Sequence, residues 1–276
     1  MRLDYSILWI EDNSEFIESI CDDIEEHIKE CGFVPHIKIY NSIDDKDLAA
    51  LNGKEYDLML IDYQLASVGG EFIDNGKDVI RKIRERKVYT NILFYSSDYK
   101  KIKDMVGLDG VFIRNRDILS LEQISELYGI IDFLMERGID INVMRGIVMS
   151  EVAEIDMIIW NIIKKMDCEE EREKLCSFVK ERIADRSKGL AKKSADELWE
   201  NIEKKGTRYF PTMDRCDYLF KRMLNKENYE KIHGDIVELI RVRNQLAHTR
   251  EVSFEKIDSR SLRKKIIEVK ASLSDL

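Results

Sequence analysis

Short, continuously apolar segments alternate with amphipathic ones over the first 119 residues, and this alternation restricts the fold more than any other feature of the chain. Strands that are apolar throughout are typical of parallel sheets, because helices bury both faces of such a sheet. Alternation with helical stretches indicates a doubly wound α/β fold. We expect five strands, at residues 6–10, 34–40, 57–61, 91–95 and 110–113, and helices at 14–31 and 76–86.

The pattern changes after Leu119, where strand signals almost vanish. Apolar residues recur at steps of three and four from Met144 to Met166, which predicts a long core helix. Further helices are expected at 169–182, 191–204, 213–224, 228–246 and 261–273. A helix at 121–137 would either close the first domain or bridge the two. We therefore predict a five-stranded parallel sheet in residues 1–120, a helical connector at 121–142, and an α-helical bundle in residues 143–276.

Composition limits the classes of function that the chain can have. Its 276 residues are enough for two domains, and its net charge of -9 gives no overall attraction to nucleic acid or anionic membranes. Any RNA-binding surface must therefore be a local basic patch. Five cysteines form no CxxC pair and no zinc-ligand spacing with the four histidines, and their odd number suits a reducing cytoplasm. With an acidic start and no apolar run of roughly 18 residues, we expect a cytoplasmic protein without a signal peptide or a membrane span.

Acidic and hydroxyl side chains follow three of the predicted strands. Glu11 and Asp12 follow the first, Asp62 the third, and Ser96 the fourth. Functional groups gather at the carboxyl ends of strands in an open parallel sheet, so these side chains are expected to meet at one edge. Converging carboxylates favour Mg²⁺, and an aspartate beside that ion can attack a phosphoryl donor. The competing interpretation is that these acids are solvated strand ends that bind no metal.

The same segments resemble the receiver domain of response regulators. ILWIEDN is similar to its first strand and acid pair, DLMLIDYQL to its phosphoacceptor strand, and NILFYSSD to its hydroxyl-bearing fourth strand. The resemblance implies that Asp62 is phosphorylated and that Ser96 is the switch hydroxyl. It also implies a Mg²⁺ site formed by Glu11, Asp12, Asp62 and the main-chain carbonyl of Gln64. A histidine kinase or a small phosphodonor would supply the phosphoryl group.

The sequence departs from the receiver pattern after the fifth strand. Receivers carry a lysine there, often followed by proline. The segment DGVFIRNRD instead offers Arg114 at the best alignment, with Arg116 as the other candidate, and no proline. Arginine keeps the charge that would bind a phosphoryl group but lacks the compact geometry of an ammonium group. The loop at 66–75 is also longer than usual.

Near the end of the chain, an arginine and a histidine stand five positions apart in the segment RNQLAH, residues 243–248. At about 100° per residue, Arg243 and His248 lie about 140° apart on a helix, whereas Asn244 and His248 share a face. Asn244 could therefore orient the imidazole while the guanidinium curls round the helix end. Histidine suits proton transfer near neutral pH, and arginine binds phosphate through a planar fork.

Through this motif the second half resembles the HEPN family, small helical bundles that often act as metal-independent endoribonucleases. The resemblance implies that His248 transfers a proton at a ribose 2′-hydroxyl and that Arg243 stabilises charge on the scissile phosphate. Asn244 would be the polar residue that follows the arginine. Such sites form where two protomers meet, so a homodimer is implied. The RNA product would carry a 2′,3′-cyclic phosphate, and no cofactor is expected in this domain.

The sequence leaves three functions open. In the first, the receiver controls an endoribonuclease that acts on RNA. In the second, the helical domain only dimerises or binds a partner protein. His248 would then pack at, or cap, a helix end that favours its positive charge, and Arg243 would be an ordinary surface or dimer-contact residue. In the third, the protein is a DNA-binding regulator, which the acidic chain and the lack of a clear helix-turn-helix spacing disfavour.

Overall fold

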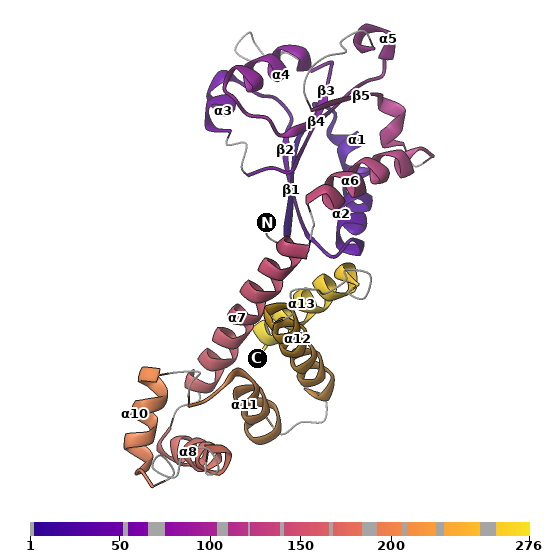
Figure 1. The fold of residues 1–276 in the computed structure, drawn as a ribbon. Coiled ribbons are helices and arrows are strands. Elements are labelled where there is room, and N and C mark those ends of the chain that lie inside the picture. The colour runs from indigo at the N-terminus through magenta and orange to yellow at the C-terminus, as the bar shows by residue number, and fades with distance from the viewer. Residues whose placement is uncertain are drawn as a thin grey trace. The chain divides into compact units, whose positions relative to one another are not determined.

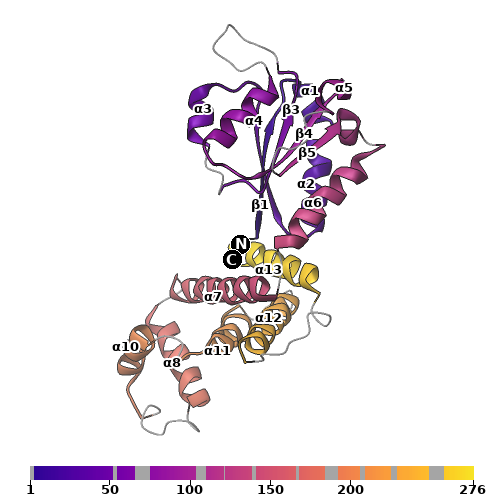
Figure 2. The ribbon, with the colours of Figure 1, turned by 45° about the horizontal axis from the view of Figure 1, so that its top comes forward.

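The computed structural model divides the chain into two compact units, Met1–Ile139 and Asp140–Leu276. Figure 1 and Figure 2 show the fold from two directions. The structure describes residues 3–51, 55–65, 75–103, 110–120, 122–138, 141–165, 168–183, 192–205, 209–224, 229–248 and 258–276.

A five-stranded, entirely parallel sheet forms the centre of the first unit. Its strands are β1 (Asp4–Ile10), β2 (Val34–Tyr40), β3 (Leu58–Asp62), β4 (Asn91–Ser96) and β5 (Val111–Asn115). They are arranged in the order β2-β1-β3-β4-β5. The strand order reverses between β1 and β3, and ligands of open α/β sheets bind outside the carboxyl ends of the strands at such a point. The predicted doubly wound fold is confirmed.

Helices cover both faces of the sheet (Figure 1). Successive side chains of a strand point to opposite faces, so Ile7 and Trp9 of β1 face one layer while Leu8 and Ile10 face the other. The first layer consists of α1 (Ser14–Glu18), α2 (Cys21–Glu30) and α6 (Ile124–Gly138). The second consists of α3 (Asp45–Ala50), α4 (Gly76–Glu85) and α5 (Tyr99–Ile102). Burial on both sides explains why β1, β3 and β4 are mostly apolar. The edge strand β2 is less buried and carries polar residues.

Some local features differ from the sequence prediction. The helix expected at 14–31 is interrupted at Ser19 and Ile20, and Ile20 has the non-helical φ of -137°. Asn13 caps α1, its side chain accepting a hydrogen bond from the Phe16 N–H at 3.0 Å. The helices α3 and α5 have only six and four residues, too few to show a helical period in the sequence.

Helix α6 packs into the core of the first unit. Its Leu127 and Ile131 are fully buried in the same cluster as Ile24 and Ile28 of α2. Directly after β5, the chain forms the short 3-10 helix η1 (Arg116–Leu119). The apolar side of α6 is therefore part of the first unit's core. The division of the chain at residues 120 and 142 stays a prediction.

The described part of the second unit is helical, as predicted. Helix α7 (Ile141–Lys165) carries the buried apolar stripe, including Met144, Val148 and Ile159. It contacts α11 (Thr212–Asp217), α12 (Glu230–His248) and α13 (Ser259–Ser274). Helices α8 (Glu169–Ile183) and α10 (Ala195–Lys205) pack against each other. None of the helices in the described residues is both long and apolar enough to cross a bilayer.

The helix expected at 213–224 consists of two different helical forms. After α11 the chain continues as a π-helix, η3 (Tyr218–Met223). The Leu224 N–H then donates to the Leu219 carbonyl at 2.9 Å, five residues back. π-helices are rare and occur mostly as single turns within α-helices, so the sequence pattern predicts one continuous helix here.

Candidate functional site

Three carboxylates meet at the carboxyl ends of β1 and β3. Glu11 and Asp12 directly follow β1, and Asp62 ends β3. One oxygen from each side chain lies within 4.8 Å of the others. Ser96, fully buried, ends the neighbouring strand β4 on the same edge. The structure thus gathers the acidic residues that the sequence placed at strand ends.

Glu11 is buried and accepts hydrogen bonds on both carboxylate oxygens. Oε1 accepts from the Asn13 N–H at 3.1 Å and from the Arg116 guanidinium at 3.0 Å. Oε2 accepts from the Tyr95 hydroxyl at 2.9 Å. Burial raises the pKa of Glu11, and the Arg116 charge opposes this rise. With exposed fractions of 0% for Glu11 and 2% for Asp62, these two acids are not solvated strand ends.

Tyr95 joins the carboxylate cluster to the core. Its hydroxyl donates to Glu11 and accepts from the indole N–H of Trp9 at 2.7 Å. Burial, followed by the negative charge of Glu11, raises the pKa of the Tyr95 phenol, so the hydroxyl stays a donor. The sequence alone does not single out Tyr95. The available signal is a tyrosine in an otherwise apolar strand, because a buried hydroxyl needs a hydrogen-bond partner.

Of the two candidate arginines, Arg116 contacts the carboxylates. Its guanidinium binds Glu11 and lies over the Phe16 ring, 4.1 Å from the ring centroid. Arg114 instead pairs with Glu126 of α6 at 2.6 Å. The register explains this difference: Arg114 lies opposite Tyr95, on the face of the sheet that α6 covers. Arg116 follows the end of β5 and reaches the edge where the acids meet.

Electrostatics make the cluster a suitable cation site. Burial, then the negative charge of Glu11, raises the pKa of Asp62 to about 7, against the opposing effect of Arg116. Three ionised carboxylates and one guanidinium leave two surplus negative charges. A hard divalent cation would relieve this repulsion, and oxygen ligands are those that Mg²⁺ prefers. The donor set therefore fits Mg²⁺.

The backbone around Asp62 is tightly packed. Gly76, the first residue of α4, lies so close that a Cβ atom at this position would be 2.0 Å from the Asp62 carbonyl oxygen. Gln64 forms an antiparallel bridge with Asn75, which ties the chain after Asp62 to the start of α4. The sequence does not reveal this requirement for glycine. Most of the predicted long loop, residues 66–74, lies outside the described residues.

In the second unit, the predicted Arg–His motif lies at the end of α12. The Arg243 guanidinium donates two hydrogen bonds to Oδ1 of the exposed Asn244, at 3.2 and 2.9 Å. This oxygen therefore holds the guanidinium, and the expected contact of Asn244 with the imidazole stays a prediction. His248 is the last residue of α12, and its side chain lies outside the described residues. The two motif side chains are thus not placed relative to each other.

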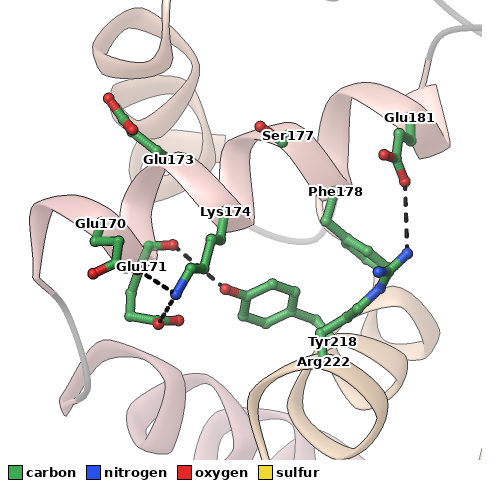
Figure 3. Close-up of a pocket in the computed structure, with 9 residues that line it drawn as sticks. All are labelled: Glu170, Glu171, Glu173, Lys174, Ser177, Phe178, Glu181, Tyr218 and Arg222. Carbon is green, nitrogen blue, oxygen red and sulfur yellow. Dashed lines mark hydrogen bonds and ion pairs between the residues drawn. The ribbon is translucent and has the colours of Figure 1, made fainter.

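A cavity of about 920 Å³ lies between α8 and η3 in the second unit (Figure 3). Lys174 forms ion pairs with Glu170 at 2.8 Å and Glu171 at 3.0 Å, and Arg222 lies 3.9 Å from Glu181. Glu173 adds a fourth carboxylate against these two cations. The surplus negative charge disfavours an RNA backbone. None of the predicted site residues lines this cavity.

No protein-family model and no curated protein matches the chain. Solved structures similar to it include the receiver domain of the Francisella response regulator 1452, which is 17% identical and has a TM-score of 0.36. That alignment covers 49% of this chain and 100% of the other. Another is the response regulator protein TrrA from Thermotoga maritima in complex with Mg²⁺-BeF, 15% identical with a TM-score of 0.29. It covers 45% of this chain and 98% of that one. The fold assignment rests on the strand order and register described above.

Proposed function

We propose that the first unit is a phosphoacceptor module of the response-regulator type, in which Asp62 accepts a phosphoryl group. The observation that carries this proposal is the meeting of Glu11, Asp12 and Asp62 at the carboxyl ends of β1 and β3. Together with the main-chain carbonyl of Gln64, these residues would hold Mg²⁺. The phosphoryl group would come from a histidine kinase or a small phosphodonor.

The chemistry follows from the side chains at this edge. A carboxylate oxygen of Asp62 attacks the phosphorus atom, and the leaving group of the donor departs with the electrons of the broken bond. Bound Mg²⁺ would supply positive charge opposite the transferred phosphoryl group. Ser96 Oγ accepts a hydrogen bond from the Asp98 N–H at 3.1 Å, so its own hydrogen can donate to a phosphoryl oxygen. Arg116 is our candidate for the phosphoryl-binding cation, because its guanidinium contacts Glu11. Arg114 is the alternative.

Phosphorylation can be measured directly on the full chain. Incubation with Mg²⁺ and phosphoramidate should add one phosphoryl group to the intact protein, detected by mass spectrometry. Asp62→Asn should not be labelled. Asp78→Asn is the matched control, because Asp78 is a half-exposed residue of α4 paired with Arg81, and this variant should be labelled like the wild type. Equal labelling of Asp62→Asn, or no labelling of the wild type by several phosphodonors, would contradict the proposal.

We further propose that the second unit is the output of this switch and acts on RNA as a metal-independent endoribonuclease in a homodimer. His248 would transfer the proton, and Arg243, aligned by Asn244, would stabilise charge on the phosphate. The contact between Arg243 and Asn244 supports this role, because it holds the guanidinium at the exposed end of α12. The alternative is a non-catalytic helical unit that dimerises or binds a partner protein.

RNA cleavage in EDTA separates these two outputs. The wild type should produce fragments with 2′,3′-cyclic phosphate ends, and His248→Ala should produce none. His36→Ala is the control, because this exposed histidine lies in the first unit and should leave cleavage unchanged. Absence of cleavage by the wild type, both before and after phosphorylation with Mg²⁺, would contradict the ribonuclease. A dimer detected by light scattering in that case would favour the non-catalytic output.

A further inference from the structure

A second cluster of metal-binding side chains lies between α2 and α6. The two helices run side by side in both Figure 1 and Figure 2. His27 and Cys31 are four residues apart, so they lie on one face of α2 and its C-terminal end. Asp132 approaches from α6. The imidazole nitrogen, the thiol sulfur and a carboxylate oxygen of these residues lie within 4.8 Å of one another.

The spacing of the three ligand atoms is close to that around a tetrahedral zinc ion. His27 Nε2 is 2.9 Å from Asp132 Oδ1, Cys31 Sγ is 3.2 Å from the same oxygen, and the sulfur and nitrogen are 3.8 Å apart. Zinc bonds of about 2.0–2.1 Å to N and O and about 2.3 Å to S place neighbouring ligand atoms roughly 3.3–3.5 Å apart. Shifts of a few tenths of an ångström would therefore admit the ion.

The surroundings hold the ligands in place and leave one side open. The His27 ring stacks on Tyr128, with centroids 3.9 Å apart and an interplanar angle of 4°. The Tyr128 hydroxyl donates to the Asp23 carbonyl at 3.2 Å, which fixes this stack to α2. His27 and Cys31 are mostly shielded, whereas the Asp132 side chain is 46% exposed. An ion can enter from that side, and water can occupy the fourth position.

The hydrogen bonds of the cluster show what an ion would replace. Asp132 Oδ1 accepts from the Cys31 thiol and contacts His27 Nε2, so one carboxylate oxygen serves both groups. Zinc would displace the thiol proton and bind the imidazole as its Nδ1–H tautomer. The nearby Tyr5 hydroxyl, 4% exposed, has no hydrogen-bond partner among the described residues. Burial and the charge of Asp57, followed by Cys31 and Asp132, raise the pKa of this phenol.

We propose that His27, Cys31 and Asp132 bind a divalent transition-metal ion of the zinc class, with water as the fourth ligand, and that this ion fastens α6 to α2. A thiolate and an imidazole select such ions, whereas Mg²⁺ prefers oxygen ligands. The four-residue step from His27 to Cys31 is visible in the sequence, although we identified no zinc-ligand spacing there. The third ligand lies 101 residues beyond Cys31 and becomes apparent only in the fold. This site requires neither phosphorylation of Asp62 nor RNA.

Cobalt(II) is a suitable probe, because it occupies zinc sites and reports its ligands in its absorption spectrum. Titration of the reduced, metal-free full chain with Co²⁺ should give a thiolate-to-metal charge-transfer band and intense d–d bands typical of tetrahedral coordination. Added Zn²⁺ should abolish both. Asp62→Asn should keep these bands, because its carboxylate belongs to the oxygen-ligand site. The outcome is therefore independent of the proposed phosphoacceptor function.

Variants identify the ligands. Cys31→Ser should lose the charge-transfer band, and Asp132→Asn should bind Co²⁺ at least about tenfold more weakly. Asp132 is half exposed, so this second variant tests the site even if Cys31→Ser fails to fold. Cys21→Ser is the matched control, because Cys21 is also in α2 but outside the cluster, and it should keep the wild-type spectrum. A wild type without the band, or equal Co²⁺ affinity in Asp132→Asn, would overturn the proposal.

Discussion

Two buried tyrosines of the same core differ in what their hydroxyl groups contact. The Tyr95 hydroxyl bonds Trp9 and Glu11, whereas the Tyr5 hydroxyl has no partner among the described residues. Tyr95→Phe leaves a buried indole N–H and a carboxylate oxygen without their partner, so we expect a loss of about 1–3 kcal/mol in the free energy of unfolding. Tyr5→Phe should be neutral or stabilising. Urea denaturation of both variants tests this, and equal losses would contradict it.

The raised pKa of Asp62 predicts a specific pH dependence of stability. Its pKa is about 7 in the folded protein, against about 3.9 in an unfolded chain. The folded state therefore binds this proton more tightly. The resulting stability is fully present below about pH 4 and is lost as the pH rises to about 7. In EDTA, Asp62→Asn should remove this decline of the free energy of unfolding with rising pH, which is on the order of 2–4 kcal/mol.

The measurement is urea denaturation of wild type and Asp62→Asn between pH 4 and pH 8. Because other groups titrate in both proteins, only the difference between them reports on Asp62. That difference should grow with pH and shrink when Mg²⁺ is added at pH 8, since the cation favours the ionised carboxylate. A difference that does not vary with pH would contradict the raised pKa.

At the scale of elements, the junction of β3 and α4 requires a glycine. In Gly76→Ala the new methyl group collides with the Asp62 carbonyl oxygen. We therefore expect the free energy of unfolding to fall by about 1–3 kcal/mol and phosphorylation to weaken. Gly129→Ala is the control, because nothing lies within 4 Å of its Cβ position in α6. In this control, the loss of backbone freedom in the unfolded chain should raise the free energy of unfolding by about 0.4–1 kcal/mol. Similar effects of the two substitutions in urea denaturation would contradict this account.

Helix α6 determines where the first unit can be cut. Leu127, Ile131 and Met135 are buried in its core, so a fragment of residues 1–120 would expose the apolar surface that α6 covers. We expect residues 1–139 to unfold cooperatively and residues 1–120 to aggregate or to bind a hydrophobic dye. Circular dichroism and dye binding of the two fragments test this. Equally cooperative unfolding of the shorter fragment would support the boundary at residue 120.

The elements also show how far sequence reasoning reaches. The five strands lie within two residues of their predicted bounds. In β1, β3 and β4, burial on both faces leaves a clear apolar run. The break at Ser19 and the π-helix η3 leave no such trace, since apolar residues stay buried through both. The acids Glu11, Asp12 and Asp62 are predictable from their positions after strands. The choice of Arg116 over Arg114 depends on the register of β5.

At the scale of the whole molecule, each unit has its own buried core and a buried charge that can serve as a marker. In the second unit, Arg215 binds Asp156 at 2.9 Å and lies over the Trp160 ring, 4.9 Å from its centroid. Burial lowers the pKa of Arg215, and Asp156 opposes this. Removing one partner of such a pair leaves a buried charge uncompensated, which typically costs about 3–5 kcal/mol. In the first unit, the buried carboxyl group of Asp62 can serve as such a marker.

We therefore expect two thermal unfolding transitions, each altered by changes in only one unit. Asp156→Ala should lower the midpoint temperature of the second unit's transition and leave that of the first unit unchanged. In EDTA at pH 8, Asp62→Asn should raise only the midpoint temperature of the first unit's transition, because it removes the repulsion with Glu11. Glu200→Ala is the control for Asp156→Ala: its ion pair with Lys204 is exposed, and its loss should leave both transitions nearly unchanged. Scanning calorimetry measures all three variants. A single transition whose midpoint temperature changes with both substitutions would mean that the two units unfold together. A change at the carboxylate site would then alter the stability of the helical unit as well.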